Sequence, residues 1–206
     1  SLMSQPHHVV IVGGGAGGIA TASSLLRRQP DLTVTVIEPS ETHKYQPGWT
    51  LVGGGVFTSK DVLRPMASVM PKRVKWVKQS VVGFDPQKNV VSLDNDTQLG
   101  YDALVVAPGI RLVWDRVEGL RDTLGQNGVT SNYAIEHAPY TWELVRRLRE
   151  GRAIFTQPAM PIKCAGAPQK AMYLSCYEWE QQGVLDRIDV EFCNAGGGLF
   201  GVADYV

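Results

Sequence analysis

Short apolar runs alternate with amphipathic stretches along this chain, and the alternation predicts an α/β fold. The run at 8–12 is typical of a buried strand, and Ile19, Ala22 and Leu26 share one face of a predicted helix over 17–28. A strand at 32–38 completes a strand–helix–strand unit, which makes the sheet at least partly parallel. The pattern also predicts strands at 74–84, 89–93, 103–106, 153–155 and 188–193, and helices at 58–69, 139–150 and 168–182.

Composition argues against several functional classes. The 206 residues include 20 Lys plus Arg and 20 Asp plus Glu, a balance that gives no support to nucleic-acid binding. No apolar run approaches the length of a membrane span, and the N-terminal stretch lacks the basic leader of a signal peptide. The three cysteines are too few for a disulfide framework, and no Cys-x-x-Cys occurs, so we predict no metal site.

A glycine-rich loop after the first strand carries a dinucleotide-binding fingerprint. Gly13, Gly15 and Gly18 form G-x-G-x-x-G between the predicted strand and helix. The first glycine permits the tight turn, the second lets a pyrophosphate approach, and the third lets helix and strand pack closely. Glu38 follows Gly18 by 20 residues, at the end of the next strand, where a carboxylate accepts ribose hydroxyls. We therefore predict a dinucleotide site that also includes Ala16 within the loop.

Two later segments favour FAD over NAD as the dinucleotide. The strand at 103–106 ends in Ala107-Pro108-Gly109, which resembles the second short FAD motif of the two-nucleotide, disulfide-reductase-like flavoproteins. The loop at 45–49 follows Glu38, and its counterpart in that group runs near the flavin ring. We therefore predict FAD, with Ala107 and Gly109 among its contacts. Trp49 could equally be an ordinary core aromatic.

A cysteine stands where a second glycine-rich loop would bind NAD(P)H. The strand at 153–155 leads instead into a segment at 156–162 that holds two prolines and a methionine, which is poorly suited to a pyrophosphate. Cys164 lies about one turn before the helix predicted at 168–182, whose positive end favours a thiolate, and Lys163 and Lys170 flank it. We predict a reactive thiol at Cys164, the alternative being an inert buried cysteine.

The remaining cysteines and histidines suggest structural or surface positions. Cys176 shares a helix face with Met172 and Trp179, which indicates a core position. Cys193 ends a strand beside a glycine turn and is expected to be a small buried residue. His43 is expected to lie in a solvent-exposed loop.

Two segments carry a more specific likeness. The stretch at 43–53, His-Lys-Tyr-Gln-Pro-Gly-Trp-Thr-Leu-Val-Gly, and the stretch at 163–170, Lys-Cys-Ala-Gly-Ala-Pro-Gln-Lys, resemble the sulfide:quinone oxidoreductases of mitochondria and many bacteria. The resemblance spans nearly the whole chain and covers the N-terminal half of such an enzyme. Lys44 departs from the family pattern, in which an aromatic residue is common at this position.

The resemblance implies an FAD-dependent enzyme that oxidises sulfide and passes two electrons to quinone. It implies that Cys164 pairs in a disulfide with a later cysteine and that sulfide attacks this disulfide to leave a persulfide. The released thiolate would donate electrons to FAD through an adduct or a charge-transfer complex. The resemblance adds Gln46 and Val81 to the FAD contacts. It also implies a peripheral position on the inner or cytoplasmic membrane, with membrane contact only through a C-terminal part beyond residue 206.

These inferences predict a Rossmann-like FAD-binding domain followed by the start of a second Rossmann-like domain. Residues 3–110 form the N-terminal part of the first domain, and residues 111–206 form an incomplete second domain that carries the redox cysteine. Because parallel sheets are normally covered on both faces and no helix follows the last strand, we expect the chain to be part of a longer protein. Two alternatives stay open: an NAD(P)H-dependent flavin disulfide oxidoreductase of the same fold, and an inactive dinucleotide-fold fragment.

Overall fold

The computed structural model describes residues 7–205, which form two compact units. The first unit contains the described residues up to Tyr45 together with Leu63–Ile110, and the second contains Gln46–Val62 and the residues from Arg111 onward. The segment at 46–62 therefore packs with the second unit. The functional domains 3–110 and 111–206 stay a prediction.

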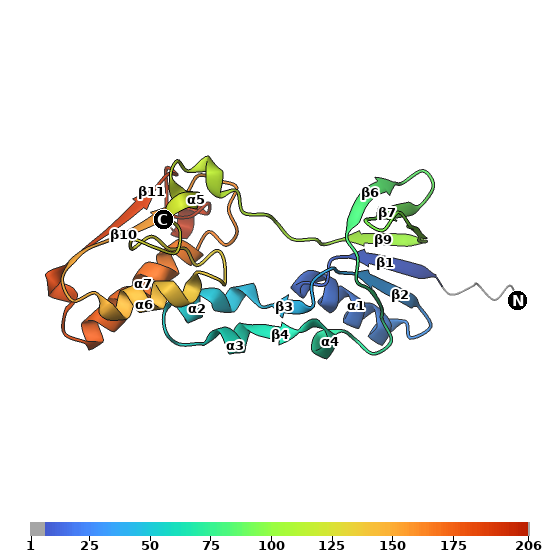
Figure 1. Cartoon of the computed structure of the whole chain (residues 1–206), viewed down its shortest axis with the longest axis horizontal. Coiled ribbons are helices and arrows are strands. Elements are labelled where there is room, and N and C mark those ends of the chain that lie inside the picture. The colour runs from blue at the N-terminus through green and yellow to red at the C-terminus, as the bar shows by residue number, and fades with distance from the viewer. Residues whose placement is uncertain (1–6, 206) are drawn as a thin grey trace, which may run out of the picture. The chain divides into compact units, whose positions relative to one another are not determined.

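A four-stranded parallel sheet forms the centre of the first unit (Figure 1). Its order is β5-β2-β1-β9, so β2 and β1 are the two inner strands. The strands are β1 (His8–Val12), β2 (Thr33–Ile37), β5 (Lys75–Val77) and β9 (Ala103–Val106). The helix α1 (Ala16–Arg28) connects β1 to β2, as the apolar spacing predicted. The parallel sheet and its crossover helix confirm the predicted α/β class.

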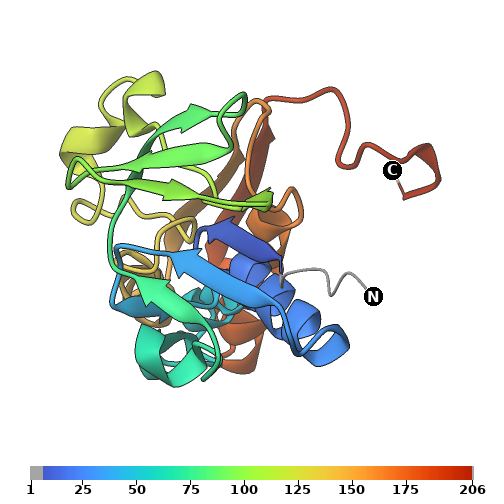
Figure 2. The ribbon, with the colours of Figure 1, turned by 90° about the vertical axis from the view of Figure 1, so that its right-hand side faces the viewer.

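The parallel sheet is covered on both faces. On one face, Ala22 and Leu26 of α1 pack with Ile11 and other buried strand residues. On the other face lies an antiparallel sheet of β6 (Val81–Asp85), β7 (Val90–Leu93) and β8 (Gln98–Gly100), whose Val91 packs with Val10. Figure 2 shows α1 in blue and the green antiparallel strands on opposite sides of β1 and β2. Burial on both faces explains why, apart from His8, β1 and β2 consist of Val, Ile and Thr.

The single strand predicted at 74–84 is wrong, because the chain changes layers within it. The first part, β5, pairs in parallel with β2, whereas the second part, β6, pairs in antiparallel with β7. The chain must turn between the two sheets at 78–80, where the carbonyl of Ser80 accepts a hydrogen bond of 2.9 Å from the Asp94 amide. Apolar character alone did not reveal this change of partner.

The single helix predicted at 58–69 is also wrong. The structure has α3 (Ser59–Val62), then β4 (Leu63–Pro65), then α4 (Met66–Val69), and β4 pairs in antiparallel with β3 (Thr42–Lys44). Pro65 disfavours a helical conformation at the residue before it, which interrupts the helix. The expected start of the helix is present, because the Asp61 carboxylate accepts the Thr58 amide at 2.7 Å.

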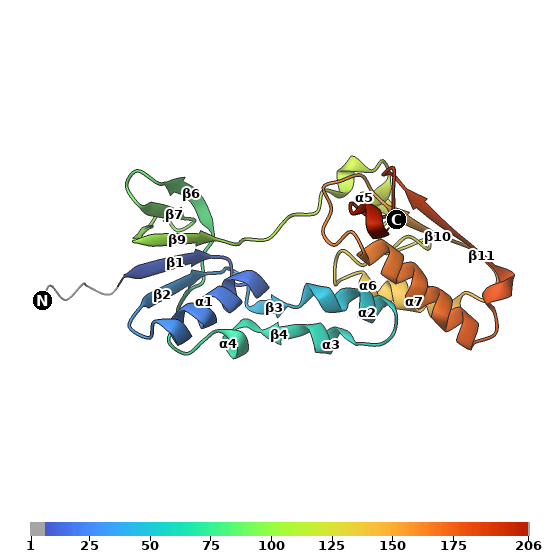
Figure 3. The same ribbon diagram turned by 180° about the vertical axis from the view of Figure 1, so that it is seen from behind.

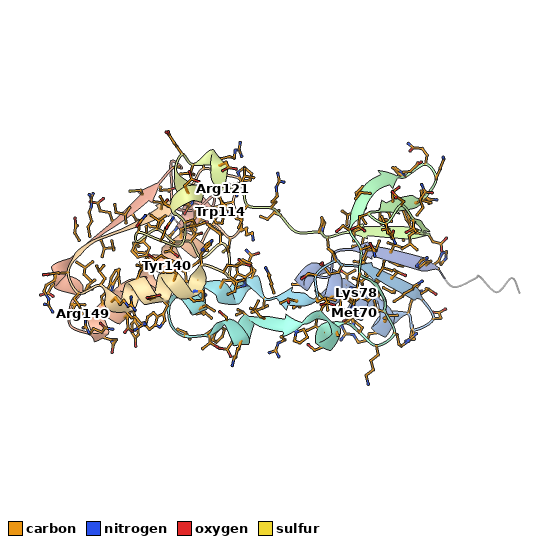
Figure 4. All side chains as sticks on the ribbon, viewed as in Figure 1. Met70, Lys78, Trp114, Arg121, Tyr140 and Arg149 are labelled. Carbon is orange, nitrogen blue, oxygen red and sulfur yellow. The ribbon has the colours of Figure 1, made fainter. Side chains whose placement is uncertain are left out.

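The second unit is built around a parallel strand pair and two long helices (Figure 3). Strands β10 (Gly151–Gln157) and β11 (Ile188–Asn194) are joined through α7 (Ala167–Gln181), and α6 (Ala138–Arg147) packs beside α7. The shorter elements of this unit are η1 (Gln46–Gly48), α2 (Trp49–Gly53), η2 (Trp114–Arg116), α5 (Leu120–Thr123), η3 (Leu185–Arg187) and η4 (Ala203–Tyr205). Arg121 of α5 lies near Trp114 of η2 (Figure 4), and its guanidinium donates to Asp115 at 2.5 Å.

None of the helices within residues 7–205 combines the length and apolar character that a bilayer span requires.

Trp179 anchors the core of the second unit, and Trp179→Phe is expected to destabilise it by about 1–3 kcal/mol. The side chain is 1% exposed, and its indole N–H donates to the Val145 carbonyl at 2.8 Å. Phenylalanine keeps most of the apolar volume but leaves that buried carbonyl without its donor. A urea denaturation midpoint measures the loss. Tyr177→Phe, which removes a hydroxyl from a 61% exposed residue of the same helix, should shift the midpoint little. Equal midpoints for the two variants would contradict the prediction.

Candidate functional site

The glycine-rich loop packs too closely against its surroundings to admit side chains at two of its positions. Gly13 has a φ of +106°, and a Cβ there would collide with the carbonyl oxygen of Ala107. A Cβ at Gly18 would collide with the carbonyl oxygen of Gly13, so α1 approaches the loop directly. At Gly15, by contrast, no heavy atom lies within 4 Å of an added Cβ. The loop is therefore tight at its first and third glycines and open at its second.

The N-terminus of α1 suits an anion. Gly15 is the N-cap residue and supplies no side-chain cap, and the first turn holds no acidic residue. Ala16 is exposed at this end of the helix. The first amides of a helix point outward and carry a partial positive charge, so an uncapped N-terminus of 13-residue α1 fits the pyrophosphate of a dinucleotide.

Glu38 lies directly against the loop. Its Oε1 accepts the Gly14 amide at 3.0 Å, and its Oε2 accepts the Ser40 amide at 2.8 Å. A Cβ at Gly14 would lie 2.8 Å from the Glu38 Cγ, which shows how closely the two pack. Each carboxylate oxygen retains a second acceptor site for a ligand hydroxyl. The structure therefore holds the predicted acid beside the predicted phosphate loop.

The turn after β9 meets the loop at the carboxyl ends of the parallel strands. The Ala107 amide donates to the Val12 carbonyl at 2.8 Å, and Gly109 has a φ of +79°. Here β1 has neighbours that follow different connections, β2 on one side and β9 on the other. Ligands of open α/β sheets bind at such a switch point. The loop, Glu38 and Ala107 therefore converge on one edge of the sheet.

Two of the predicted FAD contacts belong to other elements of the chain. Val81 opens β6 and packs into the apolar layer between the two sheets. Gln46 begins η1 and belongs to the second unit. The contact of these two residues with FAD stays a prediction.

His43 was expected in a solvent-exposed loop, and this expectation is wrong. The residue is half-buried in β3, and its Nδ1 lies 3.0 Å from the carbonyl oxygen of Gly14. Because a carbonyl oxygen can only accept, Nδ1 carries the proton and donates. Glu38 and His43 thus hold the two polar groups of the same glycine. Only the position of His43 in the segment that carries the family likeness could have drawn attention to it.

His43→Phe is expected to weaken FAD binding by about fivefold, because the loss of one hydrogen bond of about 1 kcal/mol loosens the Gly14 peptide. Phenylalanine keeps the ring and removes the donor. Quenching of flavin fluorescence during titration measures the dissociation constant. Thr42→Ala, a change at an exposed position on the same strand, is the control and should leave the constant unchanged. An unchanged constant in His43→Phe would show that the bond does not support the loop.

Cys164 lies in the turn that enters α7. Its thiol is free and exposed, and its carbonyl oxygen accepts the Ala167 amide at 3.2 Å. Gly166 is the N-cap of α7 and supplies no side-chain cap, so the helix presents an uncapped positive end beside the cysteine. The exposure of Cys164 contradicts the alternative of an inert buried cysteine.

The other two cysteines, Cys176 and Cys193, were both expected in buried positions. Cys176 is half-buried and packs against the core around Trp179, and burial raises the pKa of its thiol. Cys193 was expected to be buried, and this is wrong because it is exposed. Side chains alternate along β11: Ile188 and Val190 face the core, whereas Cys193 shares the opposite face with Glu191.

Trp49 is a buried residue of α2, with 7% of its surface exposed. The Lys163 ammonium lies 4.9 Å from the centroid of its ring, within cation–π range. Among residues 7–205, no group accepts a hydrogen bond from its indole N–H. Trp49 is thus a packed aromatic of the second unit, next to the residue that precedes Cys164.

Comparison with known proteins supports a flavoprotein assignment. Residues 7–149 match the family model described as pyridine nucleotide-disulphide oxidoreductase. The mitochondrial sulfide:quinone oxidoreductase of Dictyostelium discoideum is 44% identical over 173 residues, which cover 84% of this chain and 38% of that protein. Its counterpart in Mus musculus is 38% identical over 187 residues, which cover 91% of this chain and 42% of that protein.

A solved structure gives the same result. The X-ray structure of the sulfide:quinone oxidoreductase from the hyperthermophilic bacterium Aquifex aeolicus matches with a TM-score of 0.75 at 29% identity, covering 91% of this chain and 43% of that chain. The chain spans about two fifths of the length of the curated relatives it matches.

These matches confirm the resemblance to sulfide:quinone oxidoreductases and the Rossmann-like fold. The family and the matched oxidoreductases are FAD-binding flavoproteins, which confirms FAD as the predicted cofactor. A glycine loop, a carboxylate and a strand-end turn lie together at one edge of the sheet. The family model matches more than half of the chain, so the chain belongs to the pyridine nucleotide-disulphide oxidoreductase family.

Proposed function

We propose that this chain supplies the FAD site and the redox thiol of an FAD-dependent sulfide:quinone oxidoreductase. The observation that carries the proposal is Cys164, an exposed thiol at the uncapped start of a 15-residue helix. A second nucleotide-binding domain would place a phosphate loop in this part of the fold. The similarity to named sulfide:quinone oxidoreductases supports the choice of sulfide and quinone as substrates.

The residues at the sheet edge fit FAD. The open position at Gly15 and the uncapped start of α1 would receive the pyrophosphate, together with Ala16. Glu38 would accept the ribose hydroxyls. Gly13 and Gly18 keep the loop close to its strand and helix, and the Ala107 and Gly109 turn lines the same edge. Gln46 and Val81 complete the proposed set on the family likeness alone.

Cys164 is proposed to act through a disulfide with a second cysteine outside this chain. Hydrosulfide attacks one sulfur of that disulfide, the S–S bond breaks, and the attacked cysteine becomes a persulfide. The other cysteine leaves as a thiolate with the bonding electron pair, so atoms and charge balance. When bound, FAD supplies a two-electron acceptor for this site. In the proposed reaction the negative charge on Cys164 would develop beside the uncapped start of α7.

The proposal includes a peripheral position at a membrane. Quinones dissolve in the bilayer, so the electron acceptor has to be reached at the membrane surface. The part of the protein outside this chain is proposed to make that contact.

Anaerobic reduction of the bound flavin tests the proposal. In the whole protein, sulfide should bleach the flavin absorbance, and quinone should restore it. NADH should leave the spectrum unchanged, because 158–161 offers no glycine loop for its pyrophosphate. Reduction by NADH and not by sulfide would overturn the proposal in favour of an NAD(P)H-dependent flavin disulfide oxidoreductase. A protein that takes up no added FAD would leave only an inactive dinucleotide-fold fragment.

A further inference from the structure

The turn that carries Cys164 is tied at two points to a single tyrosine. The Tyr133 hydroxyl donates to the carbonyl oxygen of Cys164 at 3.1 Å. The Lys163 ammonium donates to the carbonyl oxygen of Tyr133 at 3.4 Å. Two successive residues of the turn are therefore bonded to one residue of the segment that precedes α6. The Cys164 carbonyl also accepts the Ala167 amide, so the tyrosine bonds to the same atom as the start of α7.

The Tyr133 hydroxyl is a permanent donor at physiological pH. Burial, and secondly the charge of Cys164, raises the pKa of Tyr133 to about 12. The phenol therefore stays protonated whether Cys164 is a thiol or a thiolate. It donates to the Cys164 carbonyl oxygen and does not exchange a proton with the Cys164 side chain.

Lys163 is held on its other side by Trp49. Its ammonium lies 4.9 Å from the centroid of the Trp49 ring, and that ring is buried in α2. A lysine side chain has several freely rotating bonds, so a ring on one side and a carbonyl on the other restrict it strongly. We call Trp49, Tyr133 and Lys163 the thiol clamp. It joins α2, the 133 segment and the Cys164 turn, all within the second unit.

We propose that Tyr133 is a positioning residue for Cys164: through the thiol clamp it fixes the Cys164 backbone at the start of α7 and so fixes the direction from which Sγ can be attacked. The role deepens the proposed function and rests on it, because thiol–disulfide exchange requires an aligned approach of one sulfur to another. Tyr133 itself does not touch the reacting atoms.

Tyr133→Phe tests the role by removing one oxygen atom. In protein whose disulfides have first been reduced, the second-order rate constant for alkylation of the Cys164 thiol by iodoacetamide is followed by mass spectrometry of its peptide. The constant should fall about threefold to tenfold, because the loss of a hydrogen bond of about 1 kcal/mol lets the turn leave the orientation in which it presents Sγ. Cys193, an exposed thiol in the same sample, should react as before.

Tyr140→Phe is the matched control. Tyr140 lies on α6 (Figure 4), and its hydroxyl accepts the Gly128 amide at 3.0 Å, so the change also removes one tyrosine hydroxyl bonded to the backbone of this unit. It should leave Cys164 unchanged. Equal effects of the two variants on Cys164, or equal changes at Cys164 and Cys193, would overturn the positioning role. If Tyr133→Phe does not fold, Lys163→Met tests the same clamp, because it removes the donor to Tyr133. Lys170→Met, which removes the charge on the other side of Cys164 and leaves the clamp intact, is its control and should have the smaller effect.

Steady-state turnover separates this role from general stability and from the proposed function. In Tyr133→Phe, kcat should fall by the same factor as alkylation, while kcat/KM for quinone and the affinity for FAD stay unchanged. A change in kcat/KM for quinone or in FAD affinity without a change in kcat would contradict positioning. Loss of Cys164 alkylation rate in a protein that does not oxidise sulfide would reject the proposed substrate and retain the positioning of Cys164 by Tyr133.

Discussion

Gly18→Ala is expected to destabilise the first unit by about 3 kcal/mol or more and to abolish FAD binding. The added Cβ would overlap the carbonyl oxygen of Gly13 and lie 2.9 Å from its carbonyl carbon. Both are backbone atoms, so neither can rotate away as a flexible side chain would. Relief requires α1 to move off β1, which opens the core between Ala22 and Ile11 and distorts the loop that would hold the pyrophosphate.

Two neighbouring glycines provide matched controls for this result. A Cβ at Gly17 would meet only the Ala107 Cβ at 3.8 Å, so Gly17→Ala at an exposed helical position should stabilise the protein by about 1 kcal/mol. A Cβ at Gly15 meets nothing within 4 Å, so Gly15→Ala should change stability by less than about 1 kcal/mol. It should still weaken FAD binding, because the methyl group fills the space into which the pyrophosphate would come.

Urea denaturation and flavin retention distinguish the three variants. Gly18→Ala should lose both stability and flavin, Gly15→Ala flavin affinity alone, and Gly17→Ala neither. A wild-type denaturation midpoint for Gly18→Ala would show that helix and strand are not in the contact seen here. Full flavin affinity in Gly15→Ala would remove the second glycine from the proposed FAD site.

The local periodicity of apolar residues was sufficient to predict the strands and helices that pack against their neighbours in sequence. The β1–α1–β2 unit follows from one apolar run, one helical stripe and one β-branched run, and its strands lie side by side. The segment at 74–84 failed because its two halves pair with different sheets, a choice made by tertiary contacts. Periodicity shows which residues are apolar, but it does not show which of the two sheets a segment will join.

Some residues of the candidate site could likewise be predicted from local sequence, and others could not. Gly13, Gly18 and Glu38 could be found because their roles depend on backbone geometry that leaves a fixed spacing. His43 and Tyr133 could not, because each acts through one hydrogen bond to a backbone carbonyl far away in sequence. Any hydrogen-bond donor of suitable length could occupy such a position, so no spacing in the sequence identifies it.

Cys164→Ser is expected to lower the rate of sulfide-dependent flavin reduction in the whole protein by at least about a thousandfold. A serine hydroxyl remains protonated at neutral pH and forms no disulfide, so hydrosulfide finds no S–S bond to attack. The residues proposed to hold the pyrophosphate and ribose lie in the first unit and are unchanged, so FAD should stay bound. Anaerobic stopped-flow absorbance measures the reduction, and the flavin-to-protein ratio measures retention.

Cys193→Ser is the matched control, because it makes the same replacement at the other exposed thiol of the chain. Cys193 lies on the face of β11 that also carries Glu191, which is hydrogen-bonded to Arg152. Its replacement should leave the reduction rate within about twofold, because surface substitutions away from a site have small effects. Normal reduction in Cys164→Ser, or an equal loss in both variants, would remove Cys164 from the role of redox thiol. Only a loss confined to Cys164 agrees with a reaction that depends on the thiol at the start of α7.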